Sequence, residues 1–91
     1  MMIRFLTQLA DIAGTKELEV KLDEDCIDVR TLLNRLGKLN KKAAEAVMLG
    51  SELAEDVYIL INGRHISSLN GLDSLVADND EITFVPVTEA G

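Results

Sequence analysis

The stretch Val57-Tyr58-Ile59-Leu60-Ile61-Asn62-Gly63 decides the fold of this chain. Its first five residues are all apolar, and most are β-branched or aromatic, which is typical of a well-buried strand. Asn62-Gly63 then supplies a strong hairpin signal, because both residue types accept the positive φ that a type I′ turn requires. The stretch therefore predicts a central strand over 57–61, a tight turn and a short strand around residues 65–66.

Two further strands are expected near the N-terminus. Residues 2–9 are predicted to form a strand with Ile3 and Phe5 on one side and Arg4 and Leu6 on the other. Residues 16–22 alternate strictly between apolar and charged side chains, which indicates a half-buried strand. A turn signal at residues 13–15 separates the two, so the pair is predicted to be a hairpin with a medium loop.

The middle of the chain is predicted to be helical. Asp28 is a suitable N-cap for an apolar stripe with helical spacing, formed by Val29, Leu32, Leu33 and Leu36. Gly37 is expected to end or loosen this helix. Asn40 is a suitable cap for a second segment that runs to Leu49, before Gly50. The pattern leaves open whether this is one bent helix or two.

The last strand is predicted over 82–87. A turn at Asp78-Asn79-Asp80 precedes it, and Pro86 marks its end because proline lacks an N–H. The order of predicted elements is β-β-α-(α)-β-(β)-β, without internal repeats or a linker. This order predicts one α+β domain in which helices pack on one face of a mixed sheet.

Composition excludes several functional classes. The 91 residues allow one domain, and their net charge of −7 disfavours nucleic-acid binding, which depends on Lys and Arg. With one cysteine and one histidine, neither a disulfide framework nor a zinc or histidine-based metal site is expected. No apolar run approaches the length of a membrane span, and no signal peptide is evident, so a cytoplasmic location and no membrane contact are expected.

The remaining candidate reactive residues have simpler structural explanations. Cys26 lies among acids, which oppose thiolate formation, so it is expected to be an unreactive thiol. His65 has no catalytic or metal-binding partner near it in sequence. Asp78, Asp80 and Glu81 lack the spacing of a calcium-binding loop and are expected to form a turn. No catalytic constellation is present.

Three motifs in the second half of the chain resemble those of the MoaD and ThiS family of ubiquitin-like sulfur carriers. The run 59–64 is similar to the family's apolar strand that ends in Asn-Gly, and the run 75–82 to its acidic turn before the last strand. Phe84-Val85-Pro86-Val87, followed by Gly91, resembles its C-terminal tail. The resemblance implies a β-grasp fold, with a single domain over 1–87 and a flexible tail over 88–91.

The family resemblance also implies a chemistry. A ubiquitin-activating-type adenylyltransferase, similar to MoeB, would use ATP to adenylate the Gly91 carboxylate, which is then converted to a thiocarboxylate. Thr88, Glu89 and Ala90 would thread the partner's channel. The chain resembles most the MoaD branch, so its acceptor partner would be a large molybdopterin synthase subunit similar to MoaE. The chain itself would bind no cofactor and would not be catalytic alone.

Strand alternation predicts a docking surface for these partners. If Ile3, Phe5 and their counterparts on the other strands face the helices, a second set of apolar side chains faces away from them. In the resembled family this sheet face docks on the activating enzyme and on the acceptor subunit. The predicted docking residues are Leu6, Tyr58, Leu60 and Val85. The alternative is that a twisted sheet buries them as core.

The sequence leaves other functions open. The same activated terminus would serve a ubiquitin-like modifier that is joined through Gly91 to target lysines. The family tail normally ends in Gly-Gly, whereas this chain has Ala90-Gly91, and the extra methyl group restricts the backbone. Either alanine is tolerated, or the partner channel is wider, or the chain is a non-activated β-grasp binding module; a truncated or processed form is also open. Molybdopterin, thiamine and thiolated tRNA all remain open as destinations of the sulfur.

Overall fold

The computed structural model describes residues 1–49, 52–54 and 56–87. Its main element is a five-stranded sheet with the strand order β2-β1-β9-β6-β7. Strands β1 and β9 run parallel, while the other neighbours run antiparallel, so the sheet is mixed as predicted. Its strands are β1 (Met2–Phe5), β2 (Glu17–Glu19), β6 (Val57–Ile61), β7 (Arg64–His65) and β9 (Glu81–Pro86).

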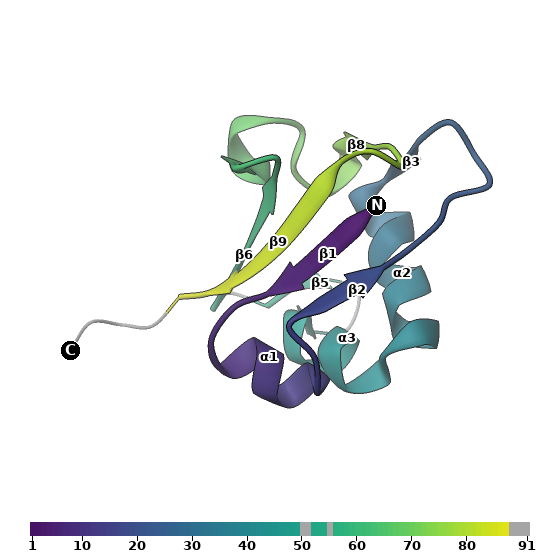
Figure 1. Cartoon of the computed structure of the whole chain (residues 1–91). Helices are drawn as coiled ribbons and strands as arrows, with labels where there is room; N and C mark the ends of the chain where they lie inside the picture. Colours follow the sequence, from purple (N-terminus) through teal and green to yellow (C-terminus); the bar gives the residue numbers. More distant parts are fainter. Residues whose placement is uncertain (50–51, 55, 88–91) are drawn as a thin grey trace.

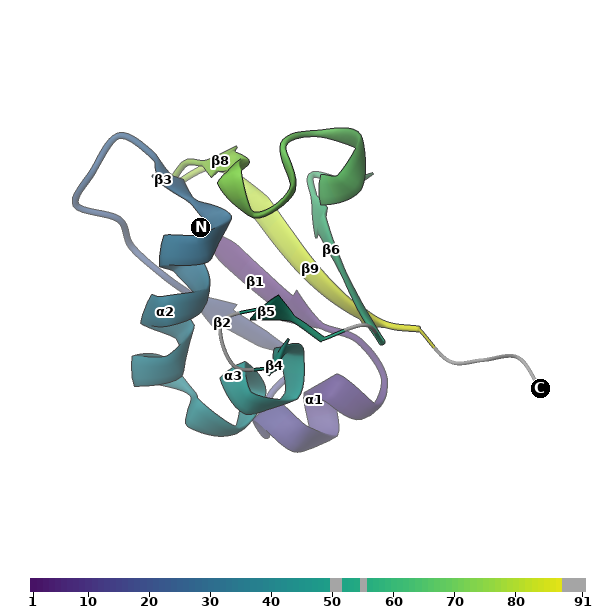
Figure 2. The same cartoon turned by 180° about the vertical axis from the view of Figure 1, so that it is seen from behind.

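The helices lie on one face of this sheet, as Figure 1 and the reverse view in Figure 2 show. They are α1 (Gln8–Ala13), α2 (Val29–Leu39) and α3 (Lys41–Val47). Two short ribbons complete the domain, one formed by β3 (Ile27–Asp28) with β8 (Leu75–Val76) and one by β4 (Met48–Leu49) with β5 (Glu52–Leu53). Two 3₁₀ turns, η1 (Ile66–Ser68) and η2 (Gly71–Asp73), lie between β7 and β8. The prediction of a mixed sheet with helices on one face is confirmed.

Helix α2 begins where the sequence predicts. The Asp28 carboxylate accepts the Thr31 N–H at 2.7 Å, and the four residues of the apolar stripe are buried. The helix runs through Gly37 to Leu39, so the prediction that this glycine ends the helix is wrong. Asn40 ends α2 and caps α3, because its side chain accepts the Ala43 N–H at 3.1 Å. The helical region is therefore two helices, the second of which ends at Val47.

The predicted strand over 2–9 is too long. It ends at Phe5, and the chain then turns through Thr7, whose φ is 47°, into α1. Leu9 is buried in the core on α1, and Gly14, with φ 77°, ends the helix in the left-handed conformation. Strand β2 pairs antiparallel with β1 as predicted, but the connection contains a helix instead of a plain loop.

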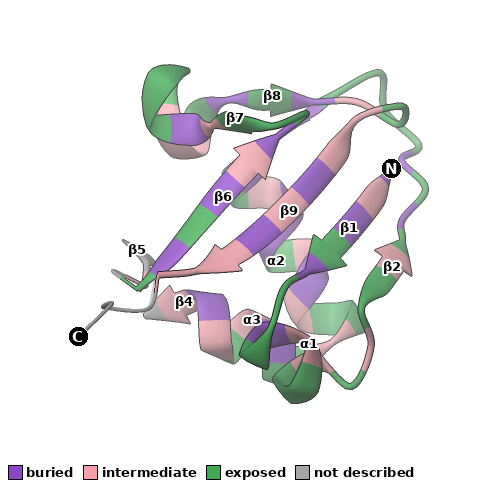
Figure 3. Cartoon of the chain, turned by 60° about the vertical axis from the view of Figure 1, so that its left-hand side comes forward, coloured by how far each residue is buried: buried purple, intermediate pink, exposed green. Residues whose placement is uncertain are grey.

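The two faces of the sheet differ in burial. Figure 3 shows buried positions alternating with more exposed ones along β1, β6 and β9. The helix-facing residues form the core, and Phe5 and Phe84 stack at its centre with ring centroids 5.5 Å apart. The six predicted inward side chains are all at most 7% exposed: Ile3, Phe5, Ile59, Ile61, Ile82 and Phe84.

The turns hold the strands in register. Asn62 and Gly63 have φ values of 51° and 84°, which are the two positive angles of the predicted type I′ turn between β6 and β7. The Asn62 side chain also binds the start of the neighbouring strand β9 and the turn before it. It donates to Asp80 Oδ1 and accepts the Glu81 N–H, both at 2.9 Å. Strand β9, rather than β6, occupies the centre of the sheet. Within the described residues, no helix is long and apolar enough to cross a membrane.

Candidate functional site

The face of the sheet opposite the helices, here called the outer face, carries the predicted docking residues. Register pairs Tyr58 with Val85 and Phe5 with Phe84. The Leu6 N–H donates to the Phe84 carbonyl at 3.2 Å, which continues the β1–β9 alignment by one residue. Leu6, one residue beyond the end of β1, Val85 on β9 and Tyr58 on β6 therefore lie side by side in this order.

These side chains are accessible. Leu6 is 40% and Tyr58 is 44% exposed, while Val85 and Leu60 are partly exposed. We call the set of Leu6, Tyr58, Leu60 and Val85 the apolar patch. Water-exposed apolar side chains that cluster on neighbouring strands are typical of a protein-docking surface. The alternative that the twisted sheet buries all four as core is therefore wrong for Leu6 and Tyr58.

Next to the apolar patch the outer face becomes charged. Leu60 and Arg4 both pair in register with Thr83, on opposite sides of it. The Arg4 guanidinium lies 3.1 Å from a carboxylate oxygen of Glu17 and 3.6 Å from one of Glu81. Because both carboxylates are about half exposed, these ion pairs orient the arginine more than they stabilise the fold. They give the outer face an acidic border.

His65 also belongs to this surface, although no pattern in the sequence predicts a role for it. It pairs in register with Leu60, and its ring packs edge-on against Tyr58 with centroids 4.5 Å apart. Its Nδ1 accepts the Ser67 N–H at 3.0 Å, which leaves Nε2 to carry the proton of the neutral ring. The two-residue turn at 62–63 fixes this register, so the sequence contained the signal that places His65 beside Leu60.

The apolar patch lies next to the strand that leads to the C-terminus. Strand β9 ends at Pro86, which pairs with Val57, and the Val87 N–H donates to the Asp56 carbonyl at 2.8 Å. The predicted tail residues lie outside the described part of the chain. These are Thr88, Glu89, Ala90 and Gly91. The described structure thus fixes the strand on which the tail begins.

The carboxylates with perturbed pKa values lie outside the apolar patch and serve the fold. The Leu22 N–H, which donates to Asp78 at 2.9 Å, lowers the pKa of that carboxyl, and the Met1 ammonium lowers it further. Hydrogen bonding by Thr31, first through its side chain and then through its backbone N–H, lowers the pKa of Asp28 at the start of α2. A hydrogen-bonded ion pair with Arg35 lowers the pKa of Glu24. Each shift comes from a contact that holds a loop or a helix end.

The remaining residues that the sequence offered as possible reactive or metal-binding groups show no sign of such a role in the described structure. Asp80 Oδ2 accepts the Ala77 N–H at 2.7 Å, which fits the predicted turn. Cys26 is an exposed free thiol. Over residues 1–49, 52–54 and 56–87, no three His, Cys, Asp or Glu side chains gather closely enough to hold a metal ion.

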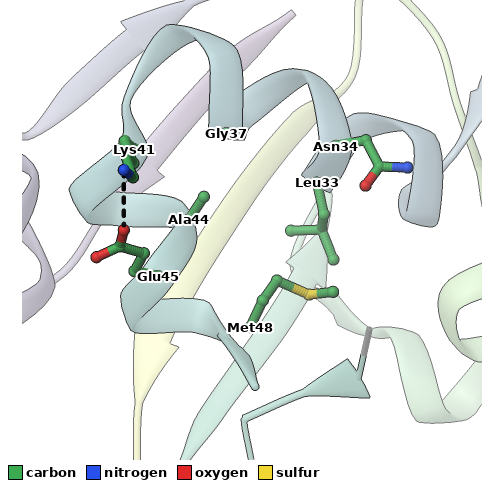
Figure 4. Close-up of a pocket in the computed structure, with 7 residues that line it drawn as sticks. All are labelled: Leu33, Asn34, Gly37, Lys41, Ala44, Glu45 and Met48. Carbon is green, nitrogen blue, oxygen red and sulfur yellow. Dashed lines mark ion pairs between the residues drawn. The ribbon is translucent and has the colours of Figure 1, made fainter. Parts of the chain in front are cut away.

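A groove of about 320 Å³ lies between α2 and α3. Figure 4 shows Leu33, Ala44 and Met48 inside it and the Lys41–Glu45 ion pair, 3.9 Å between Nζ and Oε1, at its rim. Gly37 lies where the two helices approach, and a Cβ there would meet that of Ala44 at 3.8 Å. The charged pair at this groove is well exposed, with the Lys41 side chain 83% and the Glu45 side chain 65% open to solvent, so it lies in water and not in an enclosed site.

Comparisons with known proteins agree with this geometry. A curated protein from Archaeoglobus fulgidus, described as a proposed sulfur carrier, is 26% identical over 80 residues, which cover 87% of this chain and 91% of that protein. The solution structure of small archaeal modifier protein 1 from Methanosarcina acetivorans is 28% identical, with a TM-score of 0.80, over 99% of this chain and 94% of that one.

A Pyrococcus furiosus structure described as a proposed molybdopterin converting factor subunit 1 shares the fold. It is 24% identical, with a TM-score of 0.71, over 96% of this chain and 95% of that one. These likenesses confirm the predicted β-grasp, ubiquitin-like fold. The model of the ThiS family matches residues 3–89, nearly the whole sequence. The protein therefore belongs to the ThiS family of ubiquitin-like sulfur carriers.

Proposed function

We propose that the protein carries sulfur as a thiocarboxylate on Gly91 and delivers it for molybdopterin formation, as the small subunit of a molybdopterin synthase. The match of the ThiS family to residues 3–89 is the observation that carries this proposal. Small sulfur carriers of this family are not catalytic themselves. The reacting group is therefore the chain's own carboxylate, and the catalytic residues belong to partner enzymes.

The chemistry needs two steps on that carboxylate. First, a carboxylate oxygen of Gly91 attacks the α-phosphorus of ATP, and pyrophosphate leaves. Then hydrosulfide, released by a sulfur donor, attacks the acyl carbon; the bond from that carbon to the AMP oxygen breaks, AMP leaves, and loss of the S–H proton gives the thiocarboxylate. The first step makes an unreactive carboxylate electrophilic, which is the general use of an activated covalent intermediate. A MoeB-like adenylyltransferase supplies the ATP site.

In this proposal, one part of the chain binds the partner and another part enters its active site. The apolar patch binds the partner, and Thr88, Glu89 and Ala90 lead Gly91 into its active site. Gly91 lies four residues beyond Val87, a separation of at most about 14 Å when the chain is extended. The partner must therefore bind close to the end of β9, where the patch lies. Support for this arrangement comes from the exposed positions of Leu6 and Tyr58 beside Val85.

The first experiment is an intact-mass measurement before and after incubation with a MoeB-like enzyme, ATP and a sulfur donor. The starting mass reports whether the chain ends at Gly91. We expect a gain equal to the replacement of one oxygen by sulfur, and no gain when Gly91 is deleted. The matched variant Ala90→Gly restores the usual double glycine, so a faster gain in that variant would measure the cost of the alanine. No gain in any variant would favour the non-activated binding module.

The apolar patch is tested with single charges. Val85→Asp or Tyr58→Asp should slow formation of the thiocarboxylate at least about tenfold, because each buries a carboxylate against an apolar partner surface. Leu75→Asp is the control, since Leu75 is 65% exposed on β8 and lies outside the five-stranded sheet. Equal rates for stably folded patch variants and the control would remove the patch from the proposed function.

The acceptor is tested separately. The thiocarboxylate form is mixed with a MoaE-like large subunit and the sulfur-free pterin precursor, and dithiolene formation is measured. Sulfur transfer to a thiamine or tRNA precursor system, with none to the pterin, would keep the carrier function and replace the acceptor. The cytoplasmic location stays a prediction from the sequence.

A second function is favoured by one comparison. The 28% identity to a small archaeal modifier protein supports conjugation of Gly91 to lysines of other proteins. The same adenylate would then be attacked by a lysine amine instead of a sulfur donor. Covalent adducts in cells that carry a Gly91 isopeptide bond would establish the modifier function, whereas a thiocarboxylate without adducts would favour the carrier.

A further inference from the structure

A second surface lies at the edge of the sheet that β2 forms. Tyr58 of the apolar patch lies on β6, near the opposite edge. A groove of about 300 Å³ runs between β2 and the end of α2, which lie side by side in Figure 1. The side chains and backbone around it come from the two elements and the segment that follows β2. The lining residues are Glu19, Val20, Lys21, Arg35, Lys38 and Leu39.

The groove presents apolar surface to solvent. Leu39 is 56% exposed, although the apolar stripe on the same helix is buried. Val20, which is 7% exposed, lies on the strand side of the groove. A large, open leucine beside a buried valine offers a contact site for an incoming apolar side chain.

The backbone beside this groove is an unpaired sheet edge. The Val20 N–H donates to the Met1 carbonyl at 2.8 Å, and the Met1 amino group donates to the Val20 carbonyl at 2.8 Å, so Val20 faces β1. In an antiparallel pair, alternate residues point their N–H and C=O groups to opposite sides. Glu19 and Lys21 therefore point theirs to the open edge, where the described residues provide no backbone partner.

Two residues before Glu19, at Glu17, the backbone groups of the same edge already have hydrogen-bond partners. The Thr15 hydroxyl donates to the Glu17 carbonyl at 2.8 Å and accepts the Glu17 N–H at 3.4 Å. This side chain occupies the hydrogen-bonding positions that an added strand would need at Glu17. The edge is thus open only next to the groove, which limits strand addition to that site.

The charge of the groove indicates the chemistry of its occupant. Lys21 and Lys38 have no ion-pair partner among the described residues, and Arg35 is held by Glu24. Glu19 is the one acid among the lining residues, in a chain whose net charge is −7. The groove is thus a locally basic site on an acidic protein, which attracts an acidic segment.

We propose that this groove binds an extended, acidic peptide segment of a partner protein. The segment adds as a strand to Glu19 and Lys21, places an apolar side chain on Leu39, and sets its acids against Lys21 and Lys38. Backbone pairing provides affinity, and alternate side chains provide specificity. This site is independent of the Gly91 chemistry, so the protein would bind such a partner while its tail engages another.

The test uses a synthetic peptide in which apolar residues alternate between acidic ends, acetyl-Glu-Asp-Val-Thr-Val-Thr-Val-Asp-Glu. Its titration into the isotope-labelled full chain is followed by amide chemical shifts. We expect the largest shifts at Glu19, Lys21 and Leu39, and none when the central threonines and valines are replaced by proline. No shifts at about 1 mM peptide, or shifts centred on the apolar patch, would overturn the proposal.

Variants separate the three contributions. Leu39→Asp and the double change Lys21→Glu with Lys38→Glu should each weaken binding at least about tenfold. Glu19→Pro removes an acid, which by charge alone would strengthen binding, but it also removes an edge donor, so weaker binding would identify strand addition. Leu75→Asp and Val85→Asp should bind the peptide within about twofold of the unaltered chain.

Folding and self-association are checked in the same samples. Circular dichroism must give the same spectrum and a similar midpoint for each variant, as expected at exposed positions. Concentration-dependent dimerisation that Leu39→Asp abolishes, with no peptide binding, would assign the groove to a second copy of this chain and overturn the proposal. Because thiocarboxylate formation is measured separately, a failure here leaves the proposed carrier function unaffected.

Discussion

At the scale of single residues, Thr7 adopts a costly backbone conformation. Its φ of 47° with ψ of −125° is disfavoured for any β-branched side chain. Thr7→Gly should therefore raise the free energy of unfolding by about 1 kcal/mol, because glycine adopts this conformation without strain. Urea denaturation measures the change.

The matched control places the same substitution at a helical φ. Thr31→Gly lies inside α2 and should lower the free energy of unfolding, because glycine is a poorer helix former than threonine and the change removes the Thr31 side-chain hydrogen bond to Asp28. Thr7→Ala keeps a Cβ and should gain little. If Thr7→Gly destabilises the protein as much as Thr31→Gly, the turn between β1 and α1 is not strained.

Asp78 makes stability depend on pH. The Leu22 N–H lowers the pKa of Asp78 below its ordinary value of 3.8, with help from the Met1 ammonium. Because the folded pKa is the lower one, this stabilisation is complete well above pH 3.8 and is lost as pH falls through the folded pKa. Asp78→Asn should lower the free energy of unfolding at pH 7, and the difference from the unaltered chain should shrink in acid.

Urea denaturation at a series of pH values measures this dependence. Asp25→Asn, at an exposed position in the loop before β3, is the control and should leave the profile parallel to that of the unaltered chain. A constant difference between Asp78→Asn and the unaltered chain across the acid range would show that the contact of Asp78 with Leu22 is not the source of the pKa shift.

At the scale of elements, Asn40 joins the three helices. Its Oδ1 accepts the Ala43 N–H at 3.1 Å, its Nδ2 donates to the Ala13 carbonyl at 2.8 Å, and its backbone N–H donates to the Leu36 carbonyl at 2.7 Å. Asn40→Ala should cost about 2 kcal/mol of unfolding free energy, because it removes both a cap and a bond to α1.

Two further substitutions separate these contributions. Asn40→Asp keeps the capping acceptor and loses the donor to Ala13, so its cost should be the smaller one, about 1 kcal/mol. Asp28→Ala removes only a cap, at the start of α2, and should cost a similar amount. All are measured by urea denaturation. Equal costs for alanine and aspartate at position 40 would mean that the contact to α1 carries the whole effect.

Local chemistry explains which elements could be predicted from the sequence. Asp28 and the turn at Asn62-Gly63 were predictable, because a cap and a type I′ turn depend on residues a few positions apart. The end of β1 was not, since Leu9 fits a strand by alternation and a helix by its tertiary contacts with the core. Gly37 stays helical because α3 packs beside it, a contact that no local pattern contains.

For the candidate site, too, local features could be predicted from the sequence and long-range contacts could not. Strand alternation predicted that Leu6, Tyr58, Leu60 and Val85 share the outer face, because alternation is a property of each strand alone. Their adjacency depends on the parallel pairing of β1 with β9, which joins the two ends of the chain. The β2–α2 groove was not predictable for a related reason, since it needs the spatial approach of Leu39 to Val20.

At the scale of the whole molecule, β9 carries a core residue and a residue of the proposed docking surface at neighbouring positions. Phe84 is fully buried against Phe5 at the centre of the sheet, whereas Val85 lies partly exposed on the outer face. Phe84→Ala should lower the free energy of unfolding by about 3–5 kcal/mol, a large part of the stability of a small domain. Val85→Asp should cost only about 1 kcal/mol, from strand propensity.

The same two variants should rank in the opposite order in partner binding. At a temperature where both are folded, Phe84→Ala should bind a MoeB-like enzyme nearly as well as the unaltered chain, since its outer face is intact. Val85→Asp should bind at least about tenfold more weakly. Urea denaturation and titration calorimetry give the two quantities. If Val85→Asp is as unstable as Phe84→Ala and binds normally, Val85 belongs to the core, and the outer face of the sheet is not the surface that positions the tail.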